Sequence, residues 1–216
     1  MKKSADPACR TCADEIEENT FDLKETGKAR RRILLHSCCG PCSTACIERL
    51  MPDYKVTVFF YNPNITDRDE YEKRKENQIK FIDALNSELP EEDRVVFIEG
   101  EYLPEDFFDA AKGLEDCPEG GERCTECFKL RLDRTARAAL VMGYPVFGTT
   151  LTVSPHKNYQ LISAIGTELG DIYEIEFLDM DFKKKAGFQR SIELSKKYEL
   201  YRQNYCGCEF SKWEDK

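Results

Sequence analysis

Arg32-Ile33-Leu34-Leu35-His36-Ser37-Cys38-Cys39-Gly40-Pro41-Cys42-Ser43 is the stretch of sequence that decides the fold. Its apolar run predicts a short buried strand over 32–37, and Gly-Pro predicts that a helix begins near Pro41. In an α/β sheet, ligands bind in the loop between the carboxyl end of a strand and the following helix. Two adjacent thiols in that loop therefore indicate a site built from sulfur.

The rest of the chain alternates short apolar runs with segments of helical periodicity. We expect further strands over 55–61, 94–98, 144–148 and 172–175. We expect helices over 41–51, 67–89, 104–113, from the Cys124 region to Gly143, 157–169 and 188–199. This alternation predicts an α/β domain over 32–216, with a mostly parallel sheet of about five strands and helices on both faces.

Two local expectations accompany this fold. Residues 1–31 are mostly polar, and we expect them to form an N-terminal extension that carries an isolated Cys9/Cys12 pair and ends in a basic cluster over 28–32. On the helix expected over 67–89, the charged side chains, Arg74 among them, are expected to face solvent.

The composition predicts a globular cytoplasmic protein. Of the 216 residues, 41% are hydrophobic and 34% are charged, as in ordinary soluble domains. No apolar run approaches the length of about 18–20 residues needed to cross a bilayer, and the first residues lack the apolar core of a signal peptide. We expect a monomer without a membrane partner. The net charge of −9 argues against non-specific binding of nucleic acid but leaves room for a local basic face.

The eleven cysteines are too many and too clustered for a simple set of buried thiols. Disulfides are disfavoured in the cytoplasm, so paired cysteines there indicate metal ligands or redox centres. Three groups fall where a strand or helix begins or ends: Cys38 with Cys39, Cys124 with Cys127, and Cys206 with Cys208. Four thiolates from two segments can hold a structural zinc ion or an iron–sulfur cluster, and both interpretations stay open at this point.

Four motifs carry a resemblance to a known family. They are Leu35–Ser43, Arg123–Leu132, Thr149-Thr150-Leu151 with Ser154–Lys157, and Tyr201–Cys208. Together, and in this order, they resemble epoxyqueuosine reductases of the QueH type over about residues 32 to 213. The resemblance does not include residues 1–31.

The resemblance implies an oxidoreductase that reduces epoxyqueuosine in the tRNA anticodon loop to queuosine, the last step of queuosine biosynthesis. It implies a 4Fe-4S cluster on Cys38, Cys39, Cys124 and Cys127. It also implies that Cys206 and Cys208 are catalytic, either as a redox-active disulfide pair or beside an additional iron. Cys42 lies where such an iron could gain a ligand. The electron donor is left unidentified.

Other residues are candidates for contact with the tRNA. Unpaired RNA bases stack on aromatic side chains, and phosphates attract arginine and lysine. The candidates are His156, Tyr61, Asn62, Arg131, Arg134, Arg137, Tyr201, Arg202 and Tyr205, with Lys183–Lys185 and Lys196-Lys197 as further basic groups. The three arginines recur every third residue, so we expect them to share one helix face. Ordinary structural roles are open for all of them: helix capping for His156, and packing or turn formation for Tyr61 and Asn62.

Three further interpretations complete the expectations. Cys46 and His36 are expected to be core residues, the histidine with its hydrogen bonds satisfied. The strand–loop–helix start also resembles the Rossmann-like nucleotide-binding PP-loop folds, although no glycine-rich phosphate signature is present. Two alternative functions therefore stay open: a zinc-stabilised RNA-binding module without catalysis, and a PP-loop-like tRNA thiolation enzyme.

Overall fold

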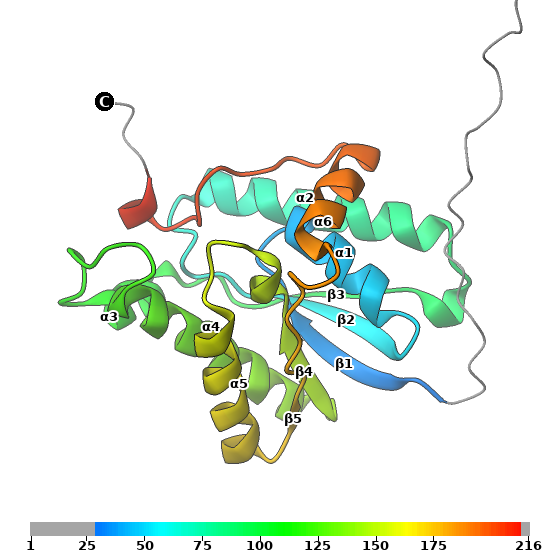
Figure 1. The fold of residues 1–216 in the computed structure, drawn as a ribbon, viewed down its shortest axis with the longest axis horizontal. Coiled ribbons are helices and arrows are strands. Elements are labelled where there is room, and N and C mark those ends of the chain that lie inside the picture. The colour runs from blue at the N-terminus through cyan, green and yellow to red at the C-terminus, as the bar shows by residue number, and fades with distance from the viewer. Residues whose placement is uncertain (1–28, 213–216) are drawn as a thin grey trace, which may run out of the picture.

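The computed structural model describes residues 29–212. Within this range, five strands form one parallel sheet in the order β3-β2-β1-β4-β5 (Figure 1). The strands are β1 (Arg31–His36), β2 (Tyr54–Phe60), β3 (Val96–Glu99), β4 (Val146–Thr149) and β5 (Glu176–Phe177). The predicted α/β class with a five-stranded parallel sheet is confirmed.

The described part of the chain contains six α-helices. They are α1 (Gly40–Leu50), α2 (Arg68–Ser87), α3 (Pro104–Ala111), α4 (Glu122–Val141), α5 (Tyr159–Tyr173) and α6 (Gly187–Lys197). Because successive side chains of a strand point to opposite faces, Ile33 and Leu35 pack in a core with α1, α2 and α6, and Leu34 packs in a second core with α4 and α5. The prediction of helices on both faces is therefore confirmed.

The central strands β1 and β4 position the site. They are neighbours in the sheet, yet the chain runs outward from β1 to β2 and β3 before it returns to β4. The sheet changes its winding direction between these two strands, and ligands of open α/β sheets bind at this point, beyond the carboxyl ends of the strands. Cys38 and Cys39 follow β1 here, and Thr149 ends β4. The likeness to nucleotide-binding folds stays a prediction.

The last strand lies later in the sequence than expected. Residues 172–175 were expected to form it, but α5 extends to Tyr173 and β5 is Glu176–Phe177. The hydroxyl of Tyr173 donates a hydrogen bond of 2.6 Å to Asp133 of α4, and this contact favours the longer helix. Glu174 then adopts a left-handed conformation, with φ of 52°, and ends the helix.

The first strand begins one residue before its expected start, and the division into an extension and a domain stays a prediction. The strand starts at Arg31, which pairs with Glu176 of β5, and Arg30 pairs with Asp93. Arg30 and Arg31, two residues of the basic cluster, therefore form ion pairs with carboxylates. Cys9 and Cys12 and most of the expected N-terminal extension lie outside the described residues.

Arg74 corrects the expected solvent-exposed face of α2. Its side chain is 1% exposed and forms an ion pair with Glu70. The other partners of its guanidinium lie in the C-terminal tail and are described below. In the part of the chain that the structure describes, no helix is both long and apolar enough to cross a lipid bilayer.

Candidate metal and thiol centre

The loop after β1 gathers three thiols. Cys38 and Cys39 follow the end of β1, and Cys42 lies in the first turn of α1. All three sulfurs lie within 4.8 Å of one another, with 3.9 Å between those of Cys38 and Cys39. Gly40 allows this tight turn, because a Cβ atom there would lie 2.7 Å from the carbonyl oxygen of Asn77. A glycine at the start of α1 thus lets the helix pack close to α2.

The electrostatic surroundings of these thiols favour a thiolate at Cys38. Its pKa is lowered well below the usual value by hydrogen bonds from Cys39 and Cys42, and further by the positive charges of Lys157 and Arg131. The pKa of the Cys39 thiol is raised to about 12, first because it shares its proton with Cys38. Thiolates are the metal-binding form of cysteine, and soft thiolate sets select zinc, copper(I) and iron–sulfur clusters. The donor set therefore suits a metal centre.

The N-terminal turns of α4 bring two more cysteines to the same edge of the sheet. Cys124 packs against the apolar cluster that contains Cys38 and Cys39. Its sulfur accepts a hydrogen bond of 3.2 Å from the backbone N–H of Gly120. Cys127, one turn later, lies in a second apolar cluster together with Cys208. The C-x-x-C pair of α4 thus lies between the β1 loop and the C-terminal tail.

The tail places Cys206 and Cys208 beside each other as free thiols. Their sulfurs are 3.4 Å apart, and the hydroxyl of Ser211 lies 2.9 Å from the Cys206 sulfur. The redox-active disulfide, one of the two roles that the resemblance implies for this pair, is not supported. The pKa of Cys206 is lowered, chiefly by hydrogen bonding from Cys208 and then from Ser211, whereas the pKa of Cys208 is raised by the same pairing. The pair therefore offers one thiolate and one thiol.

Buried contacts with α2 hold the tail in place. Arg74 donates to the carbonyl oxygen of Cys206 at 3.0 Å and to that of Tyr205 at 3.2 Å. Gly207 adopts a φ of 112°, and a Cβ atom there would lie 2.8 Å from Ile65. Glycine is required between the two cysteines for both reasons.

Gln203 connects the tail to the β1 loop directly. Its Nε2 donates a hydrogen bond of 3.0 Å to the sulfur of Cys39. Its Oε1 is buried and has no hydrogen-bond partner among the described residues. Sequence reasoning missed Gln203, and also the tail contacts of Arg74, because both depend on long-range contacts. Their signals were the position of Gln203 in the Tyr201–Cys208 motif and the periodicity of α2.

The other predicted substrate residues differ in their surroundings. Tyr61 is buried and donates from its hydroxyl to Asp106 at 3.1 Å. Asn62 is fully buried and donates to the Ser37 carbonyl at 2.9 Å, while its Oδ1 has no partner in the described part of the chain. His156 is exposed. It does not cap α5, because the capping side chain is that of Asn158.

The arginines of α4 do not form one free basic face. Arg131 is 3% exposed, and its Nε donates to the carbonyl oxygen of Cys127. Arg134 is paired with Glu101 at 2.7 Å, and Arg137 with Asp133 at 2.8 Å. The expected shared face is therefore wrong for Arg131, which faces the thiols instead. Contact of Arg134 and Arg137 with RNA stays a prediction.

The aromatic and basic residues of the tail are held by α2 and α6. The Tyr201 hydroxyl donates to Glu70 at 3.1 Å, and the Lys73 amine lies 3.5 Å from the centre of its ring. Arg202 donates to the hydroxyl of Ser195 at 3.0 Å. The Tyr205 ring lies 5.2 Å from the Arg74 guanidinium. These residues lie in the same segment as Cys206, as expected, but each already has a partner within the chain.

Two core interpretations are confirmed. His36 is fully buried, and its ring nitrogens lie 3.0 Å from the Thr149 hydroxyl and 3.1 Å from the Tyr61 carbonyl. Burial, with a smaller contribution from Arg131, lowers the pKa of His36 to about 3. Cys46 is fully buried in the core of α1, α2 and α6.

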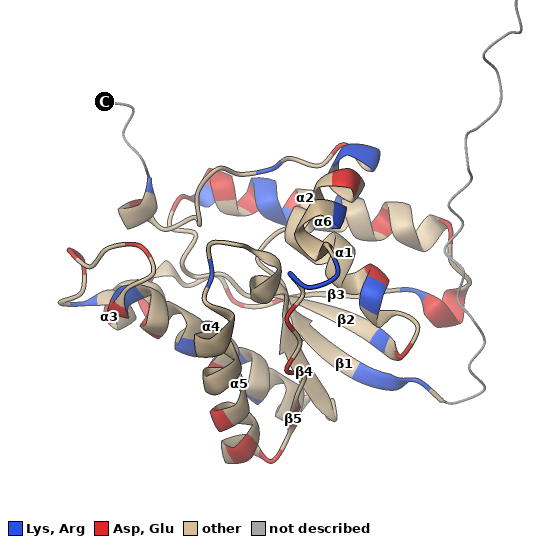
Figure 2. Cartoon of the chain, viewed as in Figure 1, with Lys and Arg blue, Asp and Glu red and all other residues tan. Residues whose placement is uncertain are grey.

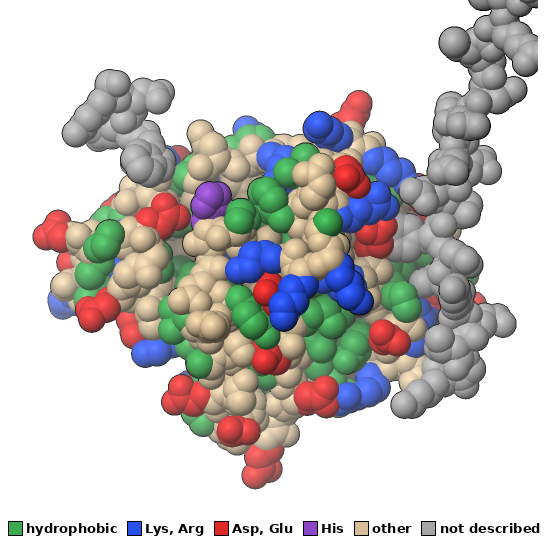
Figure 3. All heavy atoms as spheres, in the orientation of Figure 1, with side chains coloured by type: hydrophobic (Ala, Val, Ile, Leu, Met, Phe, Trp, Pro, Cys, Tyr) green, Lys and Arg blue, Asp and Glu red, His purple; other side chains and the backbone are tan. Residues whose placement is uncertain are grey.

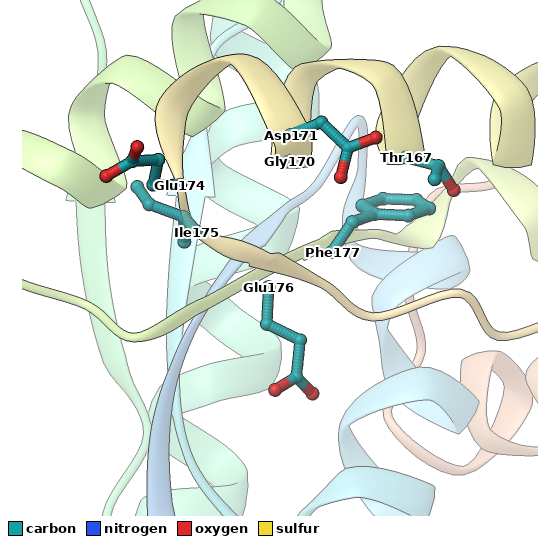
Figure 4. A pocket seen from close by; sticks show the side chains of 7 residues that line it. All are labelled: Thr167, Gly170, Asp171, Glu174, Ile175, Glu176 and Phe177. Atoms are coloured by element: carbon teal, nitrogen blue, oxygen red, sulfur yellow. The ribbon is translucent and has the colours of Figure 1, made fainter.

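A cavity of about 420 Å³ lies elsewhere, between α5 and β5 (Figure 4). It is lined by Thr167, Gly170, Asp171, Glu174, Ile175, Glu176 and Phe177. The cavity lies at the beginning of β5, whereas the thiols lie beyond the carboxyl ends of β1 and β4. It is therefore distinct from the thiol centre.

Buried thiols at the switch point of a parallel α/β sheet form a site that could bind a metal. The family model described as epoxyqueuosine reductase QueH matches residues 33–214 of the chain. The chain belongs to the epoxyqueuosine reductase QueH family, which confirms the resemblance and the expected oxidoreductase class.

Individual relatives agree with this assignment. A protein named epoxyqueuosine reductase QueH from Staphylococcus epidermidis is 43% identical over 200 residues, covering 92% of this chain and 83% of the relative. The protein of that name from Streptococcus pyogenes serotype M1 is 39% identical over 198 residues, covering 92% and 77%. The one from Thermotoga maritima is 37% identical over 182 residues, covering 83% and 89%.

Proposed function

We propose that this protein reduces epoxyqueuosine to queuosine in the tRNA anticodon loop, as the last step of queuosine biosynthesis, using a 4Fe-4S cluster. The observation that carries the proposal is the meeting of three cysteine-bearing segments at one sheet edge, in a chain that belongs to the QueH family. The nine cysteines that the structure describes are all free, as expected in the reducing cytoplasm, where we place the reaction.

Cys38, Cys39, Cys124 and Cys127 are the proposed cluster ligands. Two of them come from the β1 loop and two from α4, and all four contact the two adjoining apolar clusters that line this edge. The positive charges of Arg131 and Lys157 favour a negatively charged centre, although burial raises the pKa of the Cys127 thiol. The thiols of Cys42, Cys206 and Cys208 exceed the four that such a cluster needs. An additional iron held by these thiols is the alternative to the proton-carrying role of the Cys206/Cys208 pair.

The reaction converts an epoxide to an alkene. It consumes two electrons and two protons, breaks both carbon–oxygen bonds of the epoxide and releases the oxygen as water. A bound iron–sulfur cluster would supply electrons one at a time, and an iron with an open position would also be a Lewis acid. The electrons come from a donor not yet identified.

The chain's own residues supply a proton and position the nucleoside. The Cys206/Cys208 pair holds one proton between two sulfurs 3.4 Å apart, at a place fixed by Arg74 and Gly207. We assign to this pair the delivery of one of the two protons to the oxygen that leaves, and the second proton comes from solvent water. Asn62 and Gln203 each present a buried oxygen without a partner in the described residues, and we assign them to positioning the nucleoside.

The test is anaerobic iron and sulfide analysis together with turnover of tRNA that contains epoxyqueuosine, followed by nucleoside mass spectrometry. We expect iron, acid-labile sulfide and queuosine. A colourless zinc protein that binds tRNA without turnover would favour the binding module, and release of pyrophosphate from ATP would favour thiolation. Cys206→Ser should abolish turnover and retain most of the cluster absorbance. Cys117→Ser is the matched control, because Cys117 is in the loop before α4 and outside both thiol-bearing apolar clusters.

A further inference from the structure

The structure has a basic surface that does not include the α4 arginines. It is formed by the loop between β5 and α6 and by the residues that contact this loop (Figure 2). Its members are Arg49, Lys157, Lys183, Lys184 and Lys185. We call this set the loop-lysine surface. In Figure 3, basic side chains gather over this part of the molecule, on the same face as an exposed histidine.

Contacts between its members show that the surface is continuous. The Lys183 amine donates to the carbonyl oxygen of Lys157 at 3.0 Å. Arg49, from α1, donates to the carbonyl oxygen of Lys184 at 2.8 Å, and its guanidinium lies over the Phe182 ring. These hydrogen bonds end on backbone carbonyls, so they fix the cations without neutralising them.

Among the described residues, the cations of the loop-lysine surface have no carboxylate partner, unlike Arg134 and Arg137 of α4. Within residues 29–212, none of its five cations lies within 4.0 Å of a carboxylate oxygen, although the Asp181 carboxylate accepts from the Lys183 backbone at 3.1 Å. Arg134 and Arg137 are both paired with acids. Binding RNA through α4 would require those ion pairs to be replaced, whereas free lysines gain from each phosphate they meet.

The loop-lysine surface also extends to the thiols. Lys157 follows β4 at the carboxyl edge of the sheet, shortly after Leu151, which packs in one apolar cluster with Cys38 and Cys39. Lys184 and Lys185 are exposed beyond it. A polyanion lying across the lysines therefore ends at the centre where the proposed chemistry takes place.

We propose that the loop-lysine surface binds the phosphate backbone of the anticodon stem and so delivers the anticodon loop to the thiol centre. The proposal rests on the proposed function, whose substrate is a nucleoside within tRNA. An acidic protein would meet the same charge, but only a nucleic acid connects regularly spaced phosphates with a base at the sulfur site. The surface also explains how a chain with a net charge of −9 can bind RNA.

The test measures the affinity of anaerobically prepared holoenzyme for substrate tRNA over a series of salt concentrations. In the Lys184→Glu/Lys185→Glu variant we expect binding to weaken by about tenfold or more and the salt slope to fall by about two. Turnover should show a raised KM and an unchanged kcat, because the loop does not touch the reacting atoms. The control is Lys55→Glu/Arg94→Glu, which makes the same charge change at exposed positions near the opposite edge of the sheet.

Lysine acetylation of the unmodified sequence gives a second measurement. Bound tRNA should protect Lys184 and Lys185 from acetic anhydride and leave Lys55 reactive. Equal affinities of the loop variant and the control, or a larger loss in Arg134→Glu/Arg137→Glu, would overturn the proposal. A holoenzyme that binds the tRNA but leaves the epoxide intact would reject the proposed function, and the same affinities would still decide whether the surface binds RNA.

Discussion

Gln203 donates a hydrogen bond of 3.0 Å from its Nε2 to the sulfur of Cys39, although 164 positions of sequence separate the two residues. This contact joins the C-terminal tail to the loop after β1. Together with the bond from Arg74 to the Cys206 carbonyl, it sets the tail thiols beside the thiols of the sheet edge. The two sequence motifs are therefore parts of one site.

Replacing Gln203 should change the reduction potential of the proposed cluster. A hydrogen bond to a ligand sulfur stabilises the more negative, reduced state and so raises the potential. We expect Gln203→Leu to lower the midpoint potential by about 40–60 mV, the equivalent of one hydrogen bond of about 1 kcal/mol. Anaerobic potentiometric titration measures the change, with Gln189→Leu, at an exposed position on α6, as control. An unchanged potential at full iron content would contradict this role of Gln203.

Arg74 should contribute strongly to stability. Arg74→Met removes the buried partner of Glu70 and two donors to the tail, and we expect a loss of about 3–5 kcal/mol in the free energy of unfolding. Urea denaturation measures it. Arg68→Met, on the same helix but in a largely exposed ion pair with Glu72, should cost less than about 1 kcal/mol. Similar losses in the two variants would show that the tail does not depend on Arg74.

The cap of α2 should give a pH-dependent contribution to stability. Asp67 accepts from the backbone N–H groups of Asp69 and Glu70, and its pKa is lowered, chiefly by the hydrogen bond from Lys212. A lowered pKa means that the stabilisation is present above the ordinary value of 3.8 and is lost as the pH falls through the lower, folded value. We expect Asp67→Ala to cost about 1 kcal/mol at pH 7.

Thermal unfolding between pH 7 and pH 3 measures how the effect of Asp67→Ala depends on pH. The difference from the wild type should stay constant down to about pH 4.5 and shrink below it. Asp69→Ala changes a neighbouring carboxylate and should show no comparable difference at pH 7. A difference that persists unchanged in acid would mean that the Asp67 charge does not contribute.

Cys42 and Cys46 should behave differently although one helical turn separates them. The Cys42 sulfur lies within 4.8 Å of those of Cys38 and Cys39, whereas Cys46 is in the hydrophobic core. We expect Cys42→Ala to lower the iron content of anaerobically purified protein. Cys46→Ala should keep the iron and lose about 1–2 kcal/mol of stability through the cavity it leaves. Equal iron contents would remove Cys42 from the metal centre.

Much of the fold was predictable because its signals are local. The alternation of apolar runs and helical periodicity gave four of the five strands, and Gly-Pro after the paired cysteines gave the start of α1. The fifth strand was misplaced by a few residues, because Ile172 and Tyr173 have strand-forming side chains but extend α5. Tertiary contact of Tyr173 with α4 outweighs that propensity.

The site was predictable in its cysteines but not in its supporting contacts. The spacing of paired cysteines in the sequence indicates a metal or redox site, so the three groups could be found without a structure. Whether an arginine is buried or free depends on distant partners: Arg74 and Arg131 were expected on exposed faces, and both are buried against the thiol-bearing segments. Gln203 was missed for the same reason, because its position in the Tyr201–Cys208 motif was its one signal.

The most direct test of the account is a single-turnover reaction of anaerobically prepared, chemically reduced holoenzyme with tRNA that contains epoxyqueuosine. Nucleoside mass spectrometry and iron analysis are carried out on the same sample, beside a Cys38→Ala/Cys124→Ala variant. We expect the wild type to yield queuosine, lighter by one oxygen atom, and the variant to lack both the cluster and the product. Queuosine formed by a variant without iron, or no product from a fully loaded wild type, would contradict the account.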